Sequence, residues 1–368
     1  MDFNKNELNK ILSEIKPADA ELLKKARERL DSLVKPPGSL GALEDIAARL
    51  AAATGELYPE TGKRTVIIFA SDNGVVEEGV AAAPQQVTLA QTINFTRGIT
   101  GVAVLAKTFG ADLTVIDAGI NGDLSHPGII GRKIRKSTGN IAKEPAMSDA
   151  ELYKAISIGV EAAKNAKDDG YKLIGAGEMG IGNTTTSSAV LCALSGFKTE
   201  EQIMPAVGKG AGLTDELYDK KISVIKKALD LHLSSFGGPL EALKLVGGFD
   251  IAAMAGVYIG AARYRLPVVI DGFISAVAAL CAFRLNPVCR DFMFPSHHSR
   301  ERGFAIAMEP LGLTAPLRFE MRLGEGSGCP LMFAVMDGAA AIIRDMATFE
   351  EASIPDEYLN NIKDAGKF

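Results

Sequence analysis

The stretch 173–190, LIGAGEMGIGNTTTSSAV, combines glycines with hydroxyl side chains, which are residue types that bind phosphate groups. Gly175, Gly177 and Gly180 form G-x-G-x-x-G directly after an apolar run, as in a dinucleotide-binding turn. Three interpretations fit this pattern. It forms a site for a single phosphate, a dinucleotide site, or a tight turn without a ligand.

The start of the next helix bears on these alternatives. A dinucleotide site needs a helix that begins within the glycines, and an acid at the end of the next strand about 20 residues on. Here the apolar-periodic segment TTSSAVLCALSG comes later, so we expect Asn183 or Thr184 to cap the helix. Glu200 has the right spacing but lies in FKTEEQIM, which is typical of a helix start. No G-K-[ST] follows, which excludes a Walker A loop. The pattern favours a monophosphate site.

Carboxylates follow several apolar runs. Glu325 stands between Gly324 and Gly326 in MRLGEGSGCP. In a closed cavity its pKa would be raised, which suits a general base, whereas in a mobile loop it would be an ordinary exposed acid. Asp72 in ASDNG and Asp271 in IDGF each follow a predicted strand. Either could contact a ribose, order a loop or cap the next helix.

Histidine and cysteine give little indication of a metal centre. His297 and His298 are adjacent, so on an extended backbone they point to opposite sides. The cysteines are scattered without a C-x-x-C motif, and we expect reduced core thiols of a cytosolic protein: Cys192, Cys281, Cys289 and Cys329. We expect no metal site and no cofactor.

Bulk composition excludes some functions. The chain has 368 residues, 47% of them hydrophobic and 23% charged, as in a globular protein with a sizeable core. A formal net charge of −5 argues against a nucleic-acid partner. The polar N-terminus lacks a signal-peptide layout, and no uninterrupted apolar run reaches the roughly 18 residues of a membrane span.

The elements that must position these residues alternate along the chain. Short apolar runs end in glycine-containing polar loops: TVIIFA in SDNG, LTVID in AGING, YKLIGA in GEMGIGN, PVVI in DGF, DFMF in PSHHS. Helical patterns such as 87–110 and 250–264 lie between them. This alternation predicts an α/β fold with a parallel sheet buried on both faces. Ligands of such sheets bind beyond the carboxyl ends of the strands, where the informative loops lie.

The two ends of the chain have helical patterns without strands. We expect residues 1–35 and 331–368 to pack together as a small helical domain, and residues 36–330 to form a large α/β domain that carries the active-site loops.

Together and in this order, the loops resemble those of the nicotinate-nucleotide–dimethylbenzimidazole phosphoribosyltransferase family, which activates the lower ligand of cobalamin. The similarity extends over nearly the whole chain, in LVKPPGSLGALE, SDNGVVEEGV, GEMGIGNTT, KLVGGFDIAAMAGVYIGAA, LPVVIDGFISAVAAL, PSHHSRERG and MRLGEGSG. The resemblance implies a Rossmann-like core and a homodimer whose partner subunit helps to close each site. It also implies transfer of phosphoribose from nicotinate mononucleotide to dimethylbenzimidazole or a related base, which gives α-ribazole phosphate and nicotinate.

The resemblance also implies roles for individual residues. Glu325 is the general base. The nucleotide and its phosphate are bound by Glu178, Gly180, Ile181, Gly182, Asn183, Thr184, Lys221 and Asp250. The acceptor base is bound by Gln91, Pro84 and Leu323. Ala83 departs from the pattern, because a serine can occupy this position of the base pocket.

The chemistry of this transfer matches what the sequence offers. A nicotinate ring attached to ribose is a pyridinium, which leaves as a neutral ring without a general acid or a metal. One carboxylate that takes the N–H proton of the benzimidazole is the minimum machinery. Two other classes of function are alternatives: an NAD(P)-dependent oxidoreductase that uses the G-x-G-x-x-G at Gly175, and a nucleotide-binding or carrier protein without turnover.

Overall fold

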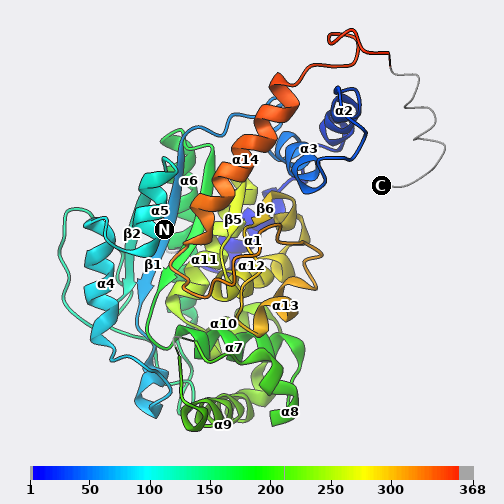
Figure 1. Ribbon diagram of the computed structural model, residues 1–368. Helices are drawn as coiled ribbons and strands as arrows, with labels where there is room; N and C mark the ends of the chain where they lie inside the picture. Colours follow the sequence, from blue (N-terminus) through cyan, green and yellow to red (C-terminus); the bar gives the residue numbers. More distant parts are fainter. Residues whose placement is uncertain (1–2, 211, 356–368) are drawn as a thin grey trace.

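A single parallel sheet organises the computed structural model, which describes residues 3–210 and 212–355 (Figure 1). The strand order is β3-β2-β1-β4-β5-β6. The strands are β1 (Arg64–Ser71), β2 (Asp112–Gly119), β3 (Ile130–Gly131), β4 (Leu173–Met179), β5 (Val268–Ile270) and β6 (Met293–Pro295). This is the order of Rossmann-like folds, in which ligands bind where the strand order reverses, here between β1 and β4. The predicted fold class is confirmed.

Helices cover both faces of the sheet. They are α1 (Lys5–Glu14), α2 (Ala20–Asp31), α3 (Ala42–Thr54), α4 (Gln86–Thr96), α5 (Gly101–Thr108), α6 (Asp149–Asp168), α7 (Asn183–Ser195), α8 (Glu200–Ile203), α9 (Asp215–His232), α10 (Pro239–Val246), α11 (Phe249–Tyr264), α12 (Phe273–Leu285), α13 (Gly303–Met308) and α14 (Gly328–Asp345). None of the described helices is both long and apolar enough to cross a membrane.

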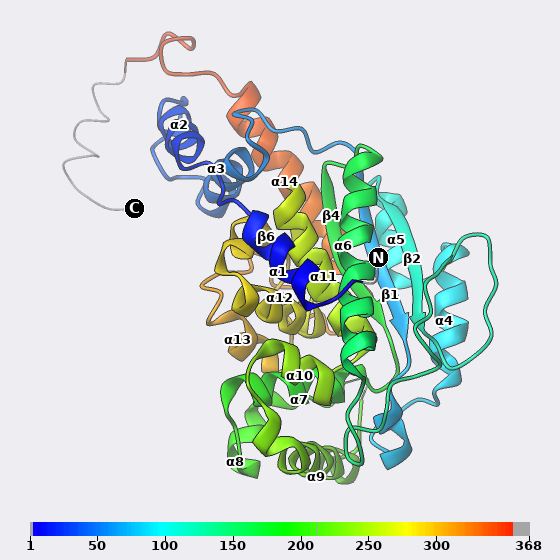
Figure 2. The same ribbon diagram turned by 180° about the vertical axis from the view of Figure 1, so that it is seen from behind.

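The side chains of β1 show how the two layers form. Ile67 and Phe69 belong to the core under α6 and α11, whereas Val66 and Ile68 belong to the core under α14 and α5. Successive strand residues point to opposite faces, so a strand apolar throughout is buried on both. Figure 2 shows α6 in front of the sheet, and Figure 1 shows α14 in front of it from the other side.

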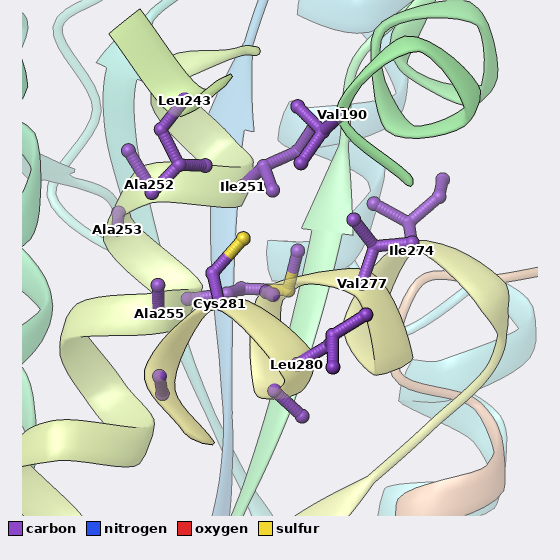
Figure 3. Close-up of a cluster of buried hydrophobic side chains, with 14 of the residues drawn as sticks. Val190, Leu243, Ile251, Ala252, Ala253, Ala255, Ile274, Val277, Leu280 and Cys281 are labelled. Atoms are coloured by element: carbon purple, nitrogen blue, oxygen red, sulfur yellow. The ribbon is translucent and has the colours of Figure 1, made fainter. Parts of the chain in front are cut away.

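The larger core supports the helices that follow the strand ends. Val190 of α7, Leu243 of α10, Ile251 of α11 and Val277 of α12 converge in this core (Figure 3). The segments α11 and α12 are apolar on all sides and almost fully buried. α12 packs against α7 together with α10, and the N-terminus of α7 lies beyond the carboxyl end of β4.

The N- and C-terminal helices lie side by side at one end of the molecule (Figures 1 and 2). α14 packs on α3 and α2, and the backbone N–H of Val34 donates to the carbonyl oxygen of Ala347 at 2.9 Å. α1 instead packs on α11. The division into domains at residues 36 and 330 stays a prediction, and residues 1–2 and 356–368 of the small domain lie outside the described residues.

The expectation of one helix over 87–110 is wrong. α4 ends at Thr96 and α5 begins at Gly101, and between them Gly98 has a φ of +72°, outside the helical region. The break lets the N-terminus of α5 turn toward the edge of the sheet.

Candidate active site

A cavity of about 770 Å³ lies at the carboxyl ends of the strands. Its wall includes most of the predicted site residues: Gln91, Glu178, Gly180, Ile181, Asn183, Thr184, Leu323 and Glu325. The other four, Pro84, Gly182, Lys221 and Asp250, are neighbours or hydrogen-bond partners of wall residues, as described below. The tertiary structure thus brings together segments that are far apart in the sequence.

Glu325 is a buried carboxylate at the cavity wall, with only 6% of its surface exposed. Its Oε1 accepts a hydrogen bond of 2.6 Å from Nε2 of Gln91, and its Oε2 accepts one of 3.4 Å from the backbone N–H of Val102 in α5. Gly324, Glu325 and Gly326 all have positive φ, at +82°, +63° and +85°. The flanking glycines adopt this conformation without a steric penalty, whereas Glu325 is held in it by its contacts. The alternative of an exposed, mobile acid is therefore wrong.

The glycines of β4 make room for the turn that carries Glu325. A Cβ on Gly177 would lie 2.6 Å from the carbonyl oxygen of Glu325, and a Cβ on Gly175 would lie 2.6 Å from the side chain of Cys329. Both glycines are strand residues, so they do not form a phosphate-binding turn. The dinucleotide interpretation is wrong, because G-x-G here reflects the close approach of another backbone segment.

Asp271, at the end of β5, anchors the same turn. Its carboxylate accepts hydrogen bonds from the backbone N–H groups of Gly326 at 3.1 Å and Gly328 at 2.7 Å. Burial raises its pKa to about 7. Asp72 orders a loop in the same way after β1. Its Oδ2 accepts a hydrogen bond of 2.7 Å from the backbone N–H of Asn121. Three roles were considered for these two aspartates. The hydrogen bonds show that each of them orders a loop.

The glycine loop after β4 leads into α7, which begins at Asn183 as expected. Its N-cap, however, is Gly182 with a φ of +93° and no side-chain cap bond, so the expectation that Asn183 or Thr184 caps the helix is wrong. The backbone N–H of Ile181 donates to Oγ1 of Thr88 at 3.1 Å. The positive end of the helix dipole nevertheless faces the cavity at Asn183 and Thr184, which line it.

Two buried carboxylates share the amide of Asn183. Its Nδ2 donates to Oε2 of Glu178 and, at 3.0 Å, to Oδ2 of Asp250. Burial, and then the proximity of Asp250, raises the pKa of Glu178 to about 8, and burial raises the pKa of Asp250 to about 7. Oε1 of Glu178 also accepts a hydrogen bond of 3.2 Å from the backbone N–H of Glu325. Glu178 therefore connects the loop before α7 to the turn that carries Glu325, while Asp250 lies behind Asn183.

Lys221 is a buried cation behind the start of α7, 1% exposed. Its Nζ donates to Oγ1 of Thr184 at 3.0 Å and to the carbonyl oxygen of Gly208 at 3.1 Å. No carboxylate among the described residues lies within ion-pair distance of this ammonium group, and burial lowers its pKa to about 8. A buried ammonium with neutral partners and an unused N–H favours the binding of an anion at Thr184.

The wall beside Gln91 is largely apolar. It is formed by Ala83, Val87 and Leu323, whose side chain lies against Gly101, while Pro84 adjoins Ala83. A flat aromatic ring with one polar edge fits such a wall, because Gln91 and Glu325 provide the hydrogen-bonding groups.

Several wall residues carried no assigned role in the sequence. They include Gly210, Gly212, Glu301 and Arg322, and also His297, whose pKa burial lowers to about 4. The glycine spacing of VGKGAGL, eight positions before Lys221 in the sequence, was an available indication that Gly210 and Gly212 lie at the cavity. His297 is buried and His298 is exposed, so the prediction that they point to opposite sides is confirmed. The described residues contain no group of three or more His, Cys, Asp or Glu placed to hold a metal ion.

Comparison with known proteins defines the class first. A family model described as "Phosphoribosyltransferase" matches residues 15–354. The chain is 54% identical over 357 residues to nicotinate-nucleotide–dimethylbenzimidazole phosphoribosyltransferase of Clostridium perfringens, covering 97% of this chain and 98% of the relative. It is 50% identical to the enzyme of the same name from Ruminiclostridium cellulolyticum, covering 93% and 96%. The crystal structure of CobT from Thermus thermophilus matches with a TM-score of 0.86 at 41% identity, covering 91% of this chain and 99% of that chain.

The chain therefore belongs to the nicotinate-nucleotide–dimethylbenzimidazole phosphoribosyltransferase family. The oxidoreductase alternative has no support among these relatives and is set aside together with the dinucleotide interpretation of β4.

Proposed function

We propose that this protein transfers phosphoribose from nicotinate mononucleotide to dimethylbenzimidazole or a related base, giving α-ribazole phosphate and nicotinate for the lower ligand of cobalamin. The observation that carries the proposal is one cavity that joins the buried carboxylate of Glu325 to an anion site at Thr184 and Lys221. Family membership supports the same reaction.

The chemical step needs one base. A ring nitrogen of the acceptor attacks C1′ of the ribose from the side opposite the nicotinate, and the C1′–N bond to nicotinate breaks. That electron pair neutralises the pyridinium, so nicotinate leaves without a proton. Glu325 takes the proton from the other ring nitrogen of the acceptor, while Gln91 keeps the carboxylate in place. Attack from the opposite side converts the β-nucleotide into an α-linked product.

The nucleotide phosphate binds at the start of α7. The loop of Gly180, Ile181 and Gly182 leads to Asn183 and Thr184, where the helix dipole and the ammonium of Lys221 attract an anion. Glu178 lines the ribose side of this site, and Asp250 holds Asn183 from behind. The acceptor base lies against Gln91, Leu323 and the segment of Ala83 and Pro84.

A second subunit completes the site in this proposal. Leu323 at the cavity wall is 59% exposed, and Val104 and Ile99 of the neighbouring α5 region are 51% and 57% exposed. Large apolar side chains next to a binding cavity are expected to be covered in an assembly. The proposal comprises a homodimer whose subunits each have a large domain, 36–330, and a small helical domain, 1–35 and 331–368. Sedimentation equilibrium that finds only monomers at catalytic concentrations would contradict it.

We also propose a cytoplasmic location, where thiols stay reduced. All four cysteines are buried and free. Fractionation of cells that produce the protein tests this assignment.

The test of the proposed function is direct turnover. The folded protein is incubated with nicotinate mononucleotide and a panel of benzimidazoles, purines and phenols, and the products are identified by mass. We expect stoichiometric release of nicotinate and α-ribazole phosphate with dimethylbenzimidazole. Binding of nicotinate mononucleotide without turnover of any acceptor would instead indicate a carrier, and would contradict the proposal.

A further inference from the structure

A line of polar side chains on α4 leads from solvent to the carboxylate of Glu325. Gln91, Asn94 and Arg97 follow one another at intervals of three residues, a spacing that puts them on one face of a helix. Arg97 is the C-cap residue of α4 and is exposed, whereas Glu325 is buried. The proposed reaction gives no role to Asn94 or Arg97, and neither residue lines the cavity.

Hydrogen bonds connect these side chains one after another. Nη1 of Arg97 donates to Oδ1 of Asn94 at 3.0 Å. Nδ2 of Asn94 donates to Oε1 of Gln91 at 3.4 Å, and Nε2 of Gln91 donates to Oε1 of Glu325 at 2.6 Å. A continuous chain of hydrogen bonds therefore joins a guanidinium group at the surface to the buried base.

The two ends of this chain determine its direction. A guanidinium group only donates hydrogen bonds, and an ionised carboxylate only accepts them. Each amide between the two ends must therefore point its oxygen toward Arg97 and its NH2 group toward Glu325. In this arrangement every hydrogen bond of the chain pairs a donor with an acceptor, and Gln91 presents an N–H group to the base.

The orientation of the Gln91 amide is linked to the protonation of Glu325. Turned around, the amide would place its oxygen against Oε1 of Glu325, a contact that is favourable only when the carboxyl group carries a proton. The hydrogen bond from Asn94 holds the amide oxygen on the other side. The backbone N–H of Val102 donates to Oε2 of the same carboxylate, so both oxygens of the base face donors, as an ionised proton acceptor requires.

We infer that Asn94, supported by Arg97, is a positioning residue that fixes the amide of Gln91 so that this amide donates to the base. The inference rests on the proposed function and deepens it. Asn94 touches no substrate in the proposed reaction and acts only through Gln91 and Glu325. Among the described residues, no carboxylate lies within ion-pair distance of Arg97, so its charge is available to Asn94. The position of Arg97 at the carboxyl end of α4 is also favoured by the helix dipole.

The experiment changes the ability of residue 94 to donate a hydrogen bond. Asn94→Leu removes both polar atoms, and Asn94→Asp keeps the shape and the acceptor for Arg97 but replaces the donor by a second acceptor. We expect kcat at neutral pH to fall about three- to tenfold in Asn94→Leu, as for loss of one hydrogen bond. The fall should be larger in Asn94→Asp, where a carboxylate oxygen faces the amide oxygen of Gln91. KM for nicotinate mononucleotide should stay within twofold, because the phosphate loop belongs to another element.

The pH profile separates positioning of the base from a general structural fault. A reversed Gln91 amide suits the protonated carboxyl group, so the loss of kcat in Asn94→Leu should be largest on the acid side and shrink as pH rises. The titratable side chains that line the cavity with Glu325 stay in place in this variant: Glu178, Asp271, His297, Glu301, Glu320 and Arg322. A loss of equal size at every pH would overturn the inference.

Thr96→Val is the matched control. It removes a hydroxyl group from the same turn of α4, where Oγ1 of Thr96 donates to the carbonyl oxygen of Ile93 at 2.7 Å, and Thr96 does not line the cavity. It should leave kcat and the pH profile unchanged. Equal losses in Thr96→Val and Asn94→Leu would overturn the inference, and so would unchanged kcat in both variants of Asn94.

Calorimetry with dimethylbenzimidazole alone separates this inference from the proposed function, because it requires no turnover. The N–H of the bound ring donates to Glu325, so affinity at neutral pH should fall about threefold in Asn94→Leu and stay unchanged in Thr96→Val. If these affinities are found but wild-type protein releases no nicotinate, the proposed function fails and the assignment of Asn94 stands. Equal affinities of wild-type protein and Asn94→Leu overturn the assignment, whatever the turnover.

Discussion

Two cavities of nearly equal size differ in how their charges are used. One, of about 770 Å³, lies at the carboxyl ends of the strands. The other, of about 740 Å³, lies between α2, α3 and the segment around Phe294. In the second cavity Arg27 pairs with Asp45 at 3.3 Å, and both side chains are more than half exposed. Arg49 donates to the carbonyl oxygen of Met293 at 2.6 Å, so its charge is used for structure.

The first cavity is instead bordered by buried ionisable groups, such as Lys221 and Glu178, that have no ion-pair partner among the described residues. Lys221 contacts only neutral acceptors, and Glu178 shares one amide with Asp250. Such groups are unfavourable for folding and are expected where a ligand completes them. Volume therefore does not distinguish the two cavities, whereas buried carboxylates without an ion-pair partner line the first.

The largest difference between the cavities is expected at Glu325. Glu325→Gln keeps an oxygen that accepts from Gln91 but removes the proton acceptor, so kcat should fall by about 10²–10⁴-fold. The KM for nicotinate mononucleotide should stay within about threefold. Steady-state kinetics with both substrates measures these values, and a variant with near-normal kcat would remove Glu325 from the role of base.

Lys221→Met tests the unpaired cation. The substitution keeps an apolar stem of similar length, and KM for nicotinate mononucleotide should rise about 10- to 100-fold through loss of a charged hydrogen bond to phosphate. Lys220→Met, on the exposed side of the same helix, is the control and should leave KM unchanged. Equal effects of the two variants would place the phosphate elsewhere.

Gly177→Ala tests the close approach of β4 to the turn that carries Glu325. A Cβ there would lie 2.6 Å from a backbone oxygen, so the turn must shift, and kcat should fall about tenfold, with about 1–3 kcal/mol lost from the free energy of unfolding. Gly131→Ala in β3, where a Cβ meets nothing within 4 Å, is the control. Kinetics and urea unfolding report the two effects, and a Gly177→Ala variant as active and stable as this control would disprove the packing argument.

The raised pKa of Glu178 makes stability depend on pH. Between the ordinary pKa of a glutamate and about 8, the folded protein binds a proton that the unfolded chain has released. This contribution to stability is therefore largest at low pH and is lost as pH rises toward 8. In Glu178→Gln the free energy of unfolding should fall less between pH 5 and pH 8, by about 1–3 kcal/mol, in urea titrations. Parallel pH profiles would contradict a raised pKa at Glu178.

The smallest effect is expected in the second cavity. Arg27→Ala breaks an exposed pair with Asp45, so kcat/KM should stay within twofold and the free energy of unfolding should change by less than about 1 kcal/mol. Kinetics and urea unfolding again provide the measurement. A large loss of activity would show that this cavity contributes to catalysis. The two cavities would then no longer differ in function.

Local patterns predicted much of the fold. The apolar runs indicated the strands, and the start of α7 at Asn183 followed from the position of the first apolar-periodic residues. The helix over 87–110 failed as a prediction because nothing apolar in its pattern marks the break near Gly98. The prediction of a capping side chain failed because the N-cap residue is Gly182, which has a left-handed conformation and no side chain.

What the sequence determined by itself is the set of chemical groups and the edge of the sheet on which they gather, because parallel strands place their carboxyl ends together. Tertiary structure decided which groups are buried and what each contacts. Gln91 and Glu325 are 234 positions apart, and the N–H of Glu325 is 147 positions from Glu178. Gly175 and Gly177 of β4 leave space for that distant turn, because a Cβ at either position would collide with it. Burial and hydrogen bonding between remote segments depend on packing, which local spacing does not encode.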